Sequence, residues 1–155
     1  DVFRHTRLGP GKPTSFGLAH LLGANRLVPV WLLGGSPEAA ECGVLAVVVP
    51  GIEALLGMPH TMFGTTARVV KLRMADGAAW AAKGAADDDQ WTQLVPVLVD
   101  ARKGLVLQVL RHHGKQHEEH GTLVVLARKN GLLVCKQGTT KCEPGDHVTV
   151  LLTDW

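Results

Sequence analysis

The stretch Leu27-Val-Pro-Val-Trp-Leu-Leu-Gly-Gly-Ser-Pro37 contains a strand, a glycine-rich loop and the start of a helix. Its first seven residues are nearly all apolar, which is typical of a strand covered on both faces in an α/β sheet. Ser36 can cap the helix with its side-chain oxygen. Pro37 suits the first helical turn, where an N–H group would have no partner. The stretch therefore predicts an α/β unit.

The helix that follows is expected to run from about residue 37 to 56. Pro50 should kink or divide it, because proline lacks an N–H group and its ring clashes with the preceding turn. Gly57 and Pro59 should end it. Before the quoted stretch, alternating side chains over residues 1–8 indicate a strand, which Gly9-Pro-Gly-Lys-Pro13 stops.

After Pro59 the sequence changes from helical spacing to short β-like runs. Asn130-Gly131 lies between two apolar runs and favours a type I′ hairpin, while Pro144-Gly-Asp146 favours another turn. The change predicts an α/β element over residues 1–60 and a small all-β, barrel-like domain over residues 61–155. The expected strands are residues 65–74, 91–99, 105–111, 122–127, 132–136 and 147–152.

Composition limits the possible partners. The chain of 155 residues is 46% hydrophobic, which is ample for a buried core, and its formal charge is only +2. So small a basic excess argues against nucleic acid as a partner. The sequence has no signal-peptide pattern at its first residues and no apolar run long enough to span a membrane, so a cytoplasmic protein is expected.

Cysteine and histidine are the candidate metal ligands. Three cysteines without a C-x-x-C pair indicate reduced thiols; Cys135 and Cys142 could face each other across a hairpin, although ordinary buried thiols are favoured. Four histidines lie between His112 and His120. His117-Glu-Glu-His120 is one residue too short for the H-E-x-x-H zinc signature, and the nearby glycines indicate a loop. We expect a solvated loop that binds metal only adventitiously, and predict no metal site.

Several motifs, in order, resemble a known family. Residues 2–17, Val-Phe-Arg-His-Thr-Arg-Leu-Gly-Pro-Gly-Lys-Pro-Thr-Ser-Phe-Gly, are similar to a strand and Pro-Gly-Lys-Pro signature of the molybdopterin molybdenumtransferases, which include MoeA and the E domain of gephyrin. Leu33-Gly-Gly-Ser-Pro37 is similar to that family's Leu-Pro-Gly-Asn-Pro loop. Pro50 and Leu55-Leu-Gly57 match its helix. Gly114-Lys-Gln116, Leu126 to Val134 and Pro144-Gly-Asp-His-Val148 match its terminal β-domain. The chain thus resembles the C-terminal portion of these proteins.

The resemblance implies half of a molybdopterin-binding domain and a role in molybdenum cofactor biosynthesis. Family members insert molybdate into molybdopterin, normally adenylylated, and release AMP. The resemblance also implies Mg²⁺, whose ligands would precede residue 1, and a homodimer or association with an N-terminal half. Lys12 would hold the oxyanion as the catalytic residue, since a fixed lysine and a glycine-rich turn before a helix suit oxyanions. The predicted molybdopterin and molybdate site comprises Pro10, Gly11, Lys12, Pro13, Gly34, Gly35, Ser36 and Pro37.

Other interpretations stay open. Both motifs also occur as an ordinary turn and an ordinary helix cap. The family's serine two residues after its Pro-Gly-Asn-Pro loop is replaced by Ala39. Its arginine-containing and Gly-Gln-Gly-Ser stretches correspond to residues 87–93 and 114–119, where Glu118 and Glu119 would repel molybdate. These departures favour the alternative of a non-catalytic relative that acts as a binding or scaffolding module. A regulatory domain with similar hairpins would not explain Pro10-Gly-Lys-Pro13.

Overall fold

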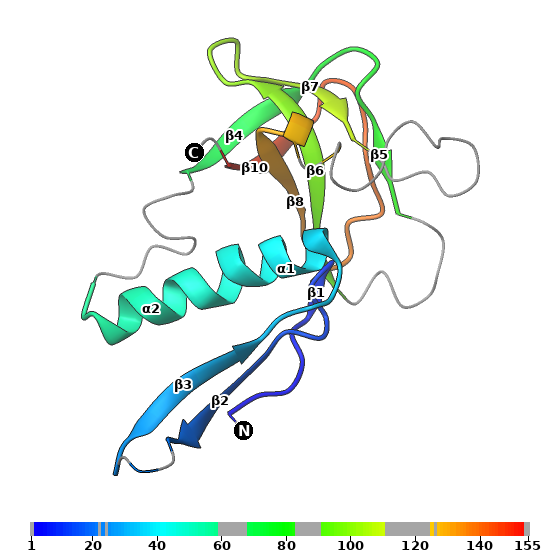
Figure 1. The fold of residues 1–155 in the computed structure, drawn as a ribbon. Coiled ribbons are helices and arrows are strands. Elements are labelled where there is room, and N and C mark those ends of the chain that lie inside the picture. The colour runs from blue at the N-terminus through cyan, green and yellow to red at the C-terminus, as the bar shows by residue number, and fades with distance from the viewer. Residues whose placement is uncertain are drawn as a thin grey trace.

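The first part of the chain is a β-hairpin with a helix beside it, and the second part is a barrel, as Figure 1 shows. The computed structural model describes residues 2–21, 23, 25–58, 68–82, 91–110, 125 and 127–153. The predicted domain boundary at residues 60 and 61 lies outside these ranges. Within them, no helix is long and apolar enough to cross a membrane.

The hairpin consists of β2 (Ser15–His20) and β3 (Leu27–Leu32), which pair antiparallel. Phe16 lies opposite Trp31, and their ring centroids are 5.3 Å apart. Phe3 bridges to Phe16, so the strand expected over residues 1–8 is reduced to this bridge and to β1 (Leu8–Gly9).

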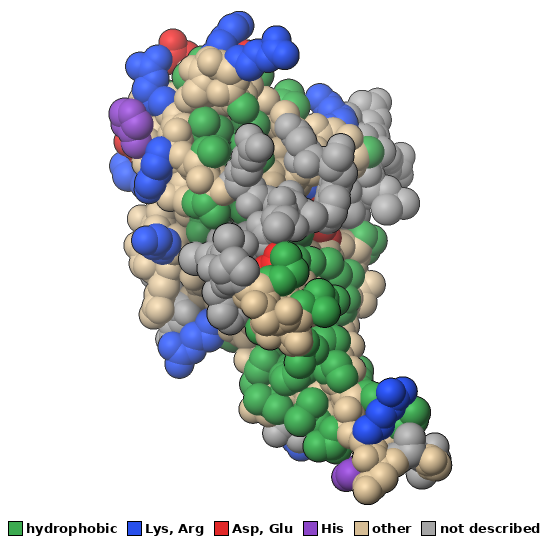
Figure 2. Space-filling model, turned by 90° about the vertical axis from the view of Figure 1, so that its left-hand side faces the viewer, with side chains coloured by type: hydrophobic (Ala, Val, Ile, Leu, Met, Phe, Trp, Pro, Cys, Tyr) green, Lys and Arg blue, Asp and Glu red, His purple; other side chains and the backbone are tan. Residues whose placement is uncertain are grey.

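The sheet covered on both faces that was expected for residues 27–33 is not seen in this chain. Among the described residues, β3 pairs only with β2, and Leu27 and Leu32 are 52% and 62% exposed. An apolar strand is buried on both faces only where neighbouring strands and a second layer of helices exist. Among the described residues, only the divided helix over residues 37–55 lies beside the hairpin, so the complete α/β domain is not seen. Figure 2 shows the hydrophobic side chains gathered over this part of the surface.

The helix begins where it was predicted but is divided into three segments: α1 (Pro37–Gly43), a π-helical segment η1 (Val44–Val48) and α2 (Val49–Leu55). Pro50 explains the division, because it removes an N–H donor and its ring crowds the carbonyl four residues earlier. The wider π-turn, in which the Val49 N–H donates to the Val44 carbonyl, accommodates this gap. Gly57, with φ of 68°, ends the helix as expected.

Two glycines bring the helix close to the hairpin. A Cβ on Gly51 would lie 3.0 Å from Cζ2 of Trp31, and one on Gly43 would lie 2.8 Å from both Leu33 Cδ2 and Thr14 Oγ1. Larger side chains at these positions would push the helix away.

Five strands close into a barrel: β4 (Arg68–Met74), β6 (Thr92–Asp100), β7 (Leu105–Val109), β8 (Gly131–Cys135) and β10 (His147–Leu152). Their order is β6-β7-β4-β10-β8, and β8 pairs with β6 to complete the circle. The short strands β5 (Trp80–Ala81) and β9 (Lys141–Cys142) form a separate pair beside it. The predicted barrel-like fold is confirmed.

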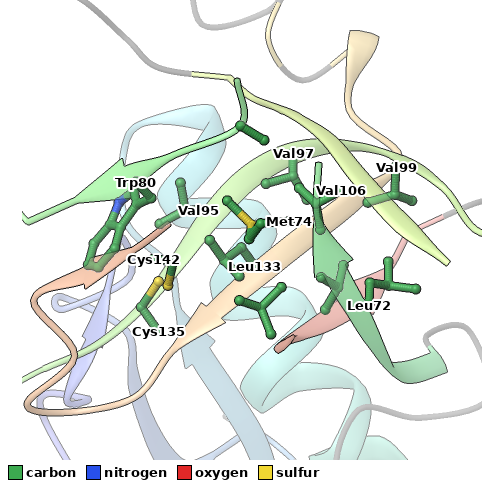
Figure 3. Close-up of a cluster of buried hydrophobic side chains, with 13 residues drawn as sticks. Leu72, Met74, Trp80, Val95, Val97, Val99, Val106, Leu133, Cys135 and Cys142 are labelled. Carbon is green, nitrogen blue, oxygen red and sulfur yellow. The ribbon is translucent and has the colours of Figure 1, made fainter. Parts of the chain in front are cut away.

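The described side chains inside the barrel are apolar. Val97, Val106, Leu133 and Val150 are fully buried, and the inward side chains in Figure 3 come from β4, β6, β7 and β8, with Trp80 at one end. Buried positions alternate along β6, as expected for a strand with one face toward a core.

A second cluster joins the helix to the outside of the barrel. Cys42 and Leu45 of the helix pack against Leu94, Leu132 and Leu151. Beside this cluster, the Lys129 ammonium donates to the Glu41 carboxylate at 2.5 Å; the Lys129 side chain is only 3% exposed.

The hairpin predicted at Asn130-Gly131 is wrong. Residues 125, 127 and 128 are helical, and Gly131 is the first residue of β8. The Asn130 side-chain amide instead pairs with the backbone of Val99, as a neighbouring strand would. Its Oδ1 accepts from the Val99 N–H at 2.7 Å, and its Nδ2 donates to the Val99 carbonyl at 2.9 Å. Gly131 is needed for close packing, since a Cβ there would lie 2.9 Å from Val150. The helical residues 125 and 127 also contradict the strand expected over residues 122–127.

The turn predicted at Pro144-Gly-Asp146 is confirmed. Gly145 has φ of 91°, and the Asp146 N–H donates to the Glu143 carbonyl at 3.1 Å. The Asp146 carboxylate also accepts from the Glu143 N–H at 2.8 Å.

Candidate functional site

The Pro10–Pro13 loop is held by its own backbone. The Thr6 N–H donates to the Lys12 carbonyl at 3.2 Å, and the Thr6 hydroxyl donates to the Gly11 carbonyl at 2.8 Å. Gly11 has φ of 125°, and a Cβ there would lie 3.2 Å from Leu8 Cδ2 and 3.7 Å from Cys42 Cβ. A side chain at Gly11 would therefore strain the backbone and push the loop off the helix.

Lys12 is exposed, and its side chain extends from this loop toward Trp91, the residue before β6. Its ammonium lies 4.7 Å from the centroid of the Trp91 ring, which is within the range of a cation–π contact. The predicted oxyanion-holding residue thus has a fixed backbone and an accessible charge.

The loop at residues 34–37 caps the helix. Ser36 is the N-cap, with φ of −82° and ψ of 148°, and its Oγ accepts from the Ala39 N–H at 3.2 Å. Pro37 occupies the first turn, as predicted. Because the Ser36 hydroxyl acts only as an acceptor in this cap, its proton can still be donated to another group. Gly35 is exposed, with open space where a Cβ would stand.

The two predicted loops lie side by side. Gly34 is buried, and a Cβ on it would lie 2.6 Å from Ala39 Cβ and 3.3 Å from Pro13 Cγ. Residues more than twenty positions apart in the sequence therefore meet at the start of the helix. The structure brings the two halves of the predicted site together.

Thr14 is a residue of this junction that the sequence did not indicate. Its N–H donates to the Gly11 carbonyl at 2.9 Å, its side chain is fully buried, and its Oγ1 has no hydrogen-bond partner within the described ranges. Gly43 passes directly over this hydroxyl. Trp91 lies in the 87–93 stretch that departs from the family pattern, but it was not predicted as a site residue, because nothing near it in the sequence points to Lys12.

The cysteines lie away from this junction, apart from Cys42. All three are free and buried, as favoured. Figure 3 shows the sulfurs of Cys135 and Cys142 side by side. Burial raises the pKa of the Cys135 thiol well above its usual range and also raises the pKa of Cys142. For Cys42, burial, helped by the negative charge of Glu41, raises the pKa to about 12. These thiols stay protonated at neutral pH and are poor nucleophiles.

Other predicted features lie outside the described residues. These are the four histidines between His112 and His120, the Gly114–Glu119 stretch and residues 87–90. In the part of the chain that the structure describes, no group of three or more His, Cys, Asp or Glu side chains could hold a metal ion.

No protein-family model matches the sequence, and no curated protein is significantly similar to it. Solved structures are similar in fold. Two structures of the molybdopterin biosynthesis MoeA protein from Pyrococcus horikoshii align with TM-scores of 0.68 and 0.67 at 18% and 15% identity, covering 98% and 97% of this chain and 32% of theirs. A molybdenum cofactor biosynthesis protein from Pyrococcus furiosus aligns with a TM-score of 0.66 at 16% identity, covering 97% of this chain and 44% of its own.

Proposed function

We propose that this chain, which shares the fold of MoeA molybdopterin biosynthesis proteins over about a third of their length, takes part in molybdenum cofactor biosynthesis. The proposed step is insertion of molybdate into molybdopterin, normally in its adenylylated form. One observation carries the proposal: on this fold, the Lys12 loop and the 34–37 loop meet at the start of one helix. The three similar structures are named for cofactor biosynthesis, which supports this role better than a scaffolding one.

The chemistry of the junction suits an oxyanion. Molybdate is a compact dianion, and Lys12 offers an accessible ammonium on a loop that Thr6 and Gly11 hold in place. An exposed charge pair alone contributes at most about 1 kcal/mol, so further donors are needed. The Ser36 hydroxyl proton can supply one, and the space beside Gly35 leaves room for the anion or for a phosphate of the pterin.

Magnesium is implied by the resemblance alone. The described residues do not fit a magnesium site, because they hold no group of three carboxylate or other ligating side chains suited to a metal. We therefore assign no step to Mg²⁺ in this chain. Its ligands are expected in the portion of the fold that this chain does not contain.

The exposed apolar surface of the hairpin and the α2 helix supports association with that missing portion or with a second copy. Leu32, Leu55 and Leu56 are 62%, 64% and 69% exposed, and Figure 2 shows a continuous hydrophobic area there. Exposed apolar patches of this kind mark protein interfaces. We propose that this surface is covered in the working protein, which acts in the cytoplasm.

Binding of molybdate and molybdopterin at low ionic strength tests the function. Isothermal titration calorimetry would compare the wild-type chain, associated with the remaining portion of the fold, with its Lys12→Ala variant and with Lys103→Ala as a matched control. Lys103 is a 74% exposed lysine beyond the far end of β6. We expect Lys12→Ala to weaken molybdate binding about tenfold, because it removes a hydrogen bond to the anion together with the charge, and such a bond contributes about 1.5 kcal/mol. Equal binding by all three proteins, or none by the wild type, would overturn the proposal.

A further inference from the structure

The barrel places an aromatic ring at the candidate site. Trp91 immediately precedes β6, and its half-buried ring lies 4.7 Å from the Lys12 ammonium. Lys12 belongs to the first part of the chain, and Trp91 to the second. The contact therefore crosses from the hairpin–helix part to the barrel.

A short parallel ladder fixes both ends of this contact. In β1, Leu8 pairs with Thr92 and Gly9 with Gln93. The Thr92 N–H also donates to the Arg7 carbonyl at 3.1 Å. The ladder thus aligns the residue before β6 with the loop after β1. Since the Lys12 carbonyl accepts from Thr6, the loop cannot swing the lysine away without breaking its own hydrogen bond.

We propose that Trp91 is a positioning residue for Lys12, so that the barrel forms one wall of the anion site. The effect on anion binding rests on the proposed function, whereas the contact between Trp91 and Lys12 does not. A cation is attracted to the electron-rich face of tryptophan more strongly than to that of phenylalanine or tyrosine. The ring contacts one side of the ammonium, and the N–H groups on the other side remain able to donate to an oxyanion.

Holding the lysine affects binding through its conformational freedom. A free lysine side chain samples many rotamers, and ordering it on binding lowers the affinity. When the ring has already restricted those rotamers, less ordering remains to oppose binding. Removal of the ring should then weaken anion binding about 2- to 10-fold, the range that corresponds to ordering one long side chain.

Nuclear magnetic resonance of ¹³C-labelled lysine tests the contact in the 155-residue chain without any ligand. Stacking on an aromatic face shifts the Lys12 ε-methylene protons upfield, and loss of one signal in Lys12→Arg assigns them. We expect the shift to vanish in Trp91→Leu and in Trp91→Gln, and to return in part in Trp91→Phe. Either ring-free variant suffices if the other fails to fold. A Lys12 signal unchanged by removal of the ring would overturn the proposal.

Titration of molybdate into the same variants, each associated with the remaining portion of the fold, tests the consequence. Weaker binding by Trp91→Leu, restored toward wild type by Trp91→Phe, would support the positioning role. Unchanged signals from the other lysines would show that Trp91→Leu has kept its fold. Equal binding by wild type and Trp91→Leu, with the shift lost, would show that the contact does not serve the anion and overturn the proposal. Absence of molybdate binding by the wild type would instead overturn the proposed function, while the ligand-free shift would still decide whether Trp91 holds Lys12.

Discussion

The barrel and the hairpin–helix part are both rich in apolar side chains but place them differently. In the barrel, Val97, Leu133 and Val150 are completely buried, because each strand pairs with two others and the sheet closes on itself. In the hairpin–helix part, Leu32 and Leu55 remain more than 60% exposed. A barrel completes its own core, whereas a hairpin with one helix buries only the faces that meet each other.

This difference separates stability from function in the molecule. The barrel supplies most of the buried apolar surface, and burial of that surface is the main driving force of folding. The candidate site lies at the edge between the two parts, where the loops of the hairpin–helix part meet the first residues of β6. Substitutions in the two parts should therefore have different consequences.

The largest effect is expected in the barrel core. Leu133→Ala removes a fully buried side chain and leaves a cavity, so it should lower the free energy of unfolding by about 2–5 kcal/mol. The matched change Leu55→Ala, on the exposed face of α2, should cost less than about 0.5 kcal/mol. Urea unfolding followed by circular dichroism measures both. Similar losses for the two variants would contradict the contrast between the two parts.

The next effect concerns the ion pair that joins the parts. Glu41→Gln leaves the Lys129 ammonium, which is only 3% exposed, without its carboxylate. Loss of a hydrogen bond to a charged group should cost about 1.5–3 kcal/mol. The double variant Glu41→Gln with Lys129→Met should regain part of this loss, because no buried charge remains. A double variant less stable than the single one would show that Lys129 does not depend on Glu41.

The sequence was most informative where a side-chain pattern depends on near neighbours. Short β-like runs over residues 91–99 and 147–152 predicted β6 and β10, and Ser36 with Pro37 predicted the start of the helix. Pro50 predicted its division, although not the π-helical segment that accommodates it.

Contacts between distant residues could not be read in the same way. Asn130-Gly131 has the composition of a hairpin turn, but Asn130 pairs with Val99 and Gly131 packs against Val150, both partners set by barrel closure. The contact between Lys12 and Trp91 depends on the parallel pairing of β1 with β6, which no local sequence pattern predicts. The sequence identified the loops of the candidate site, while their roles stay predictions.

A smaller effect, the pH dependence of the stability that Cys42 contributes, tests whether water is excluded from the cluster between the helix and the barrel. Burial raises the Cys42 pKa from 9.0 to about 12, so the thiol ionises more readily in the unfolded chain. The unfolded state then binds fewer protons between these two pH values, and stability falls as pH rises. The advantage of wild type over Cys42→Ala should shrink by about 1.4 kcal/mol per pH unit within this window, for example from pH 9.5 to 10.5. Denaturant unfolding at the two pH values measures it; a constant difference would mean that water reaches Cys42 in the folded protein.

The smallest effect on stability should accompany a clear effect on association. Leu55→Lys replaces a 64% exposed leucine near the end of α2, where a positive charge also suits the helix dipole, so the stability change should stay below about 0.5 kcal/mol. If the apolar face of the hairpin and α2 is an interface, this variant should associate less in sedimentation velocity runs over a range of concentrations. Leu107→Lys, at a 42% exposed leucine of β7 in the barrel, is the control. Equal loss of association in both variants would place the contact elsewhere. An interface on the hairpin and α2 would then no longer account for the apolar side chains that are exposed there.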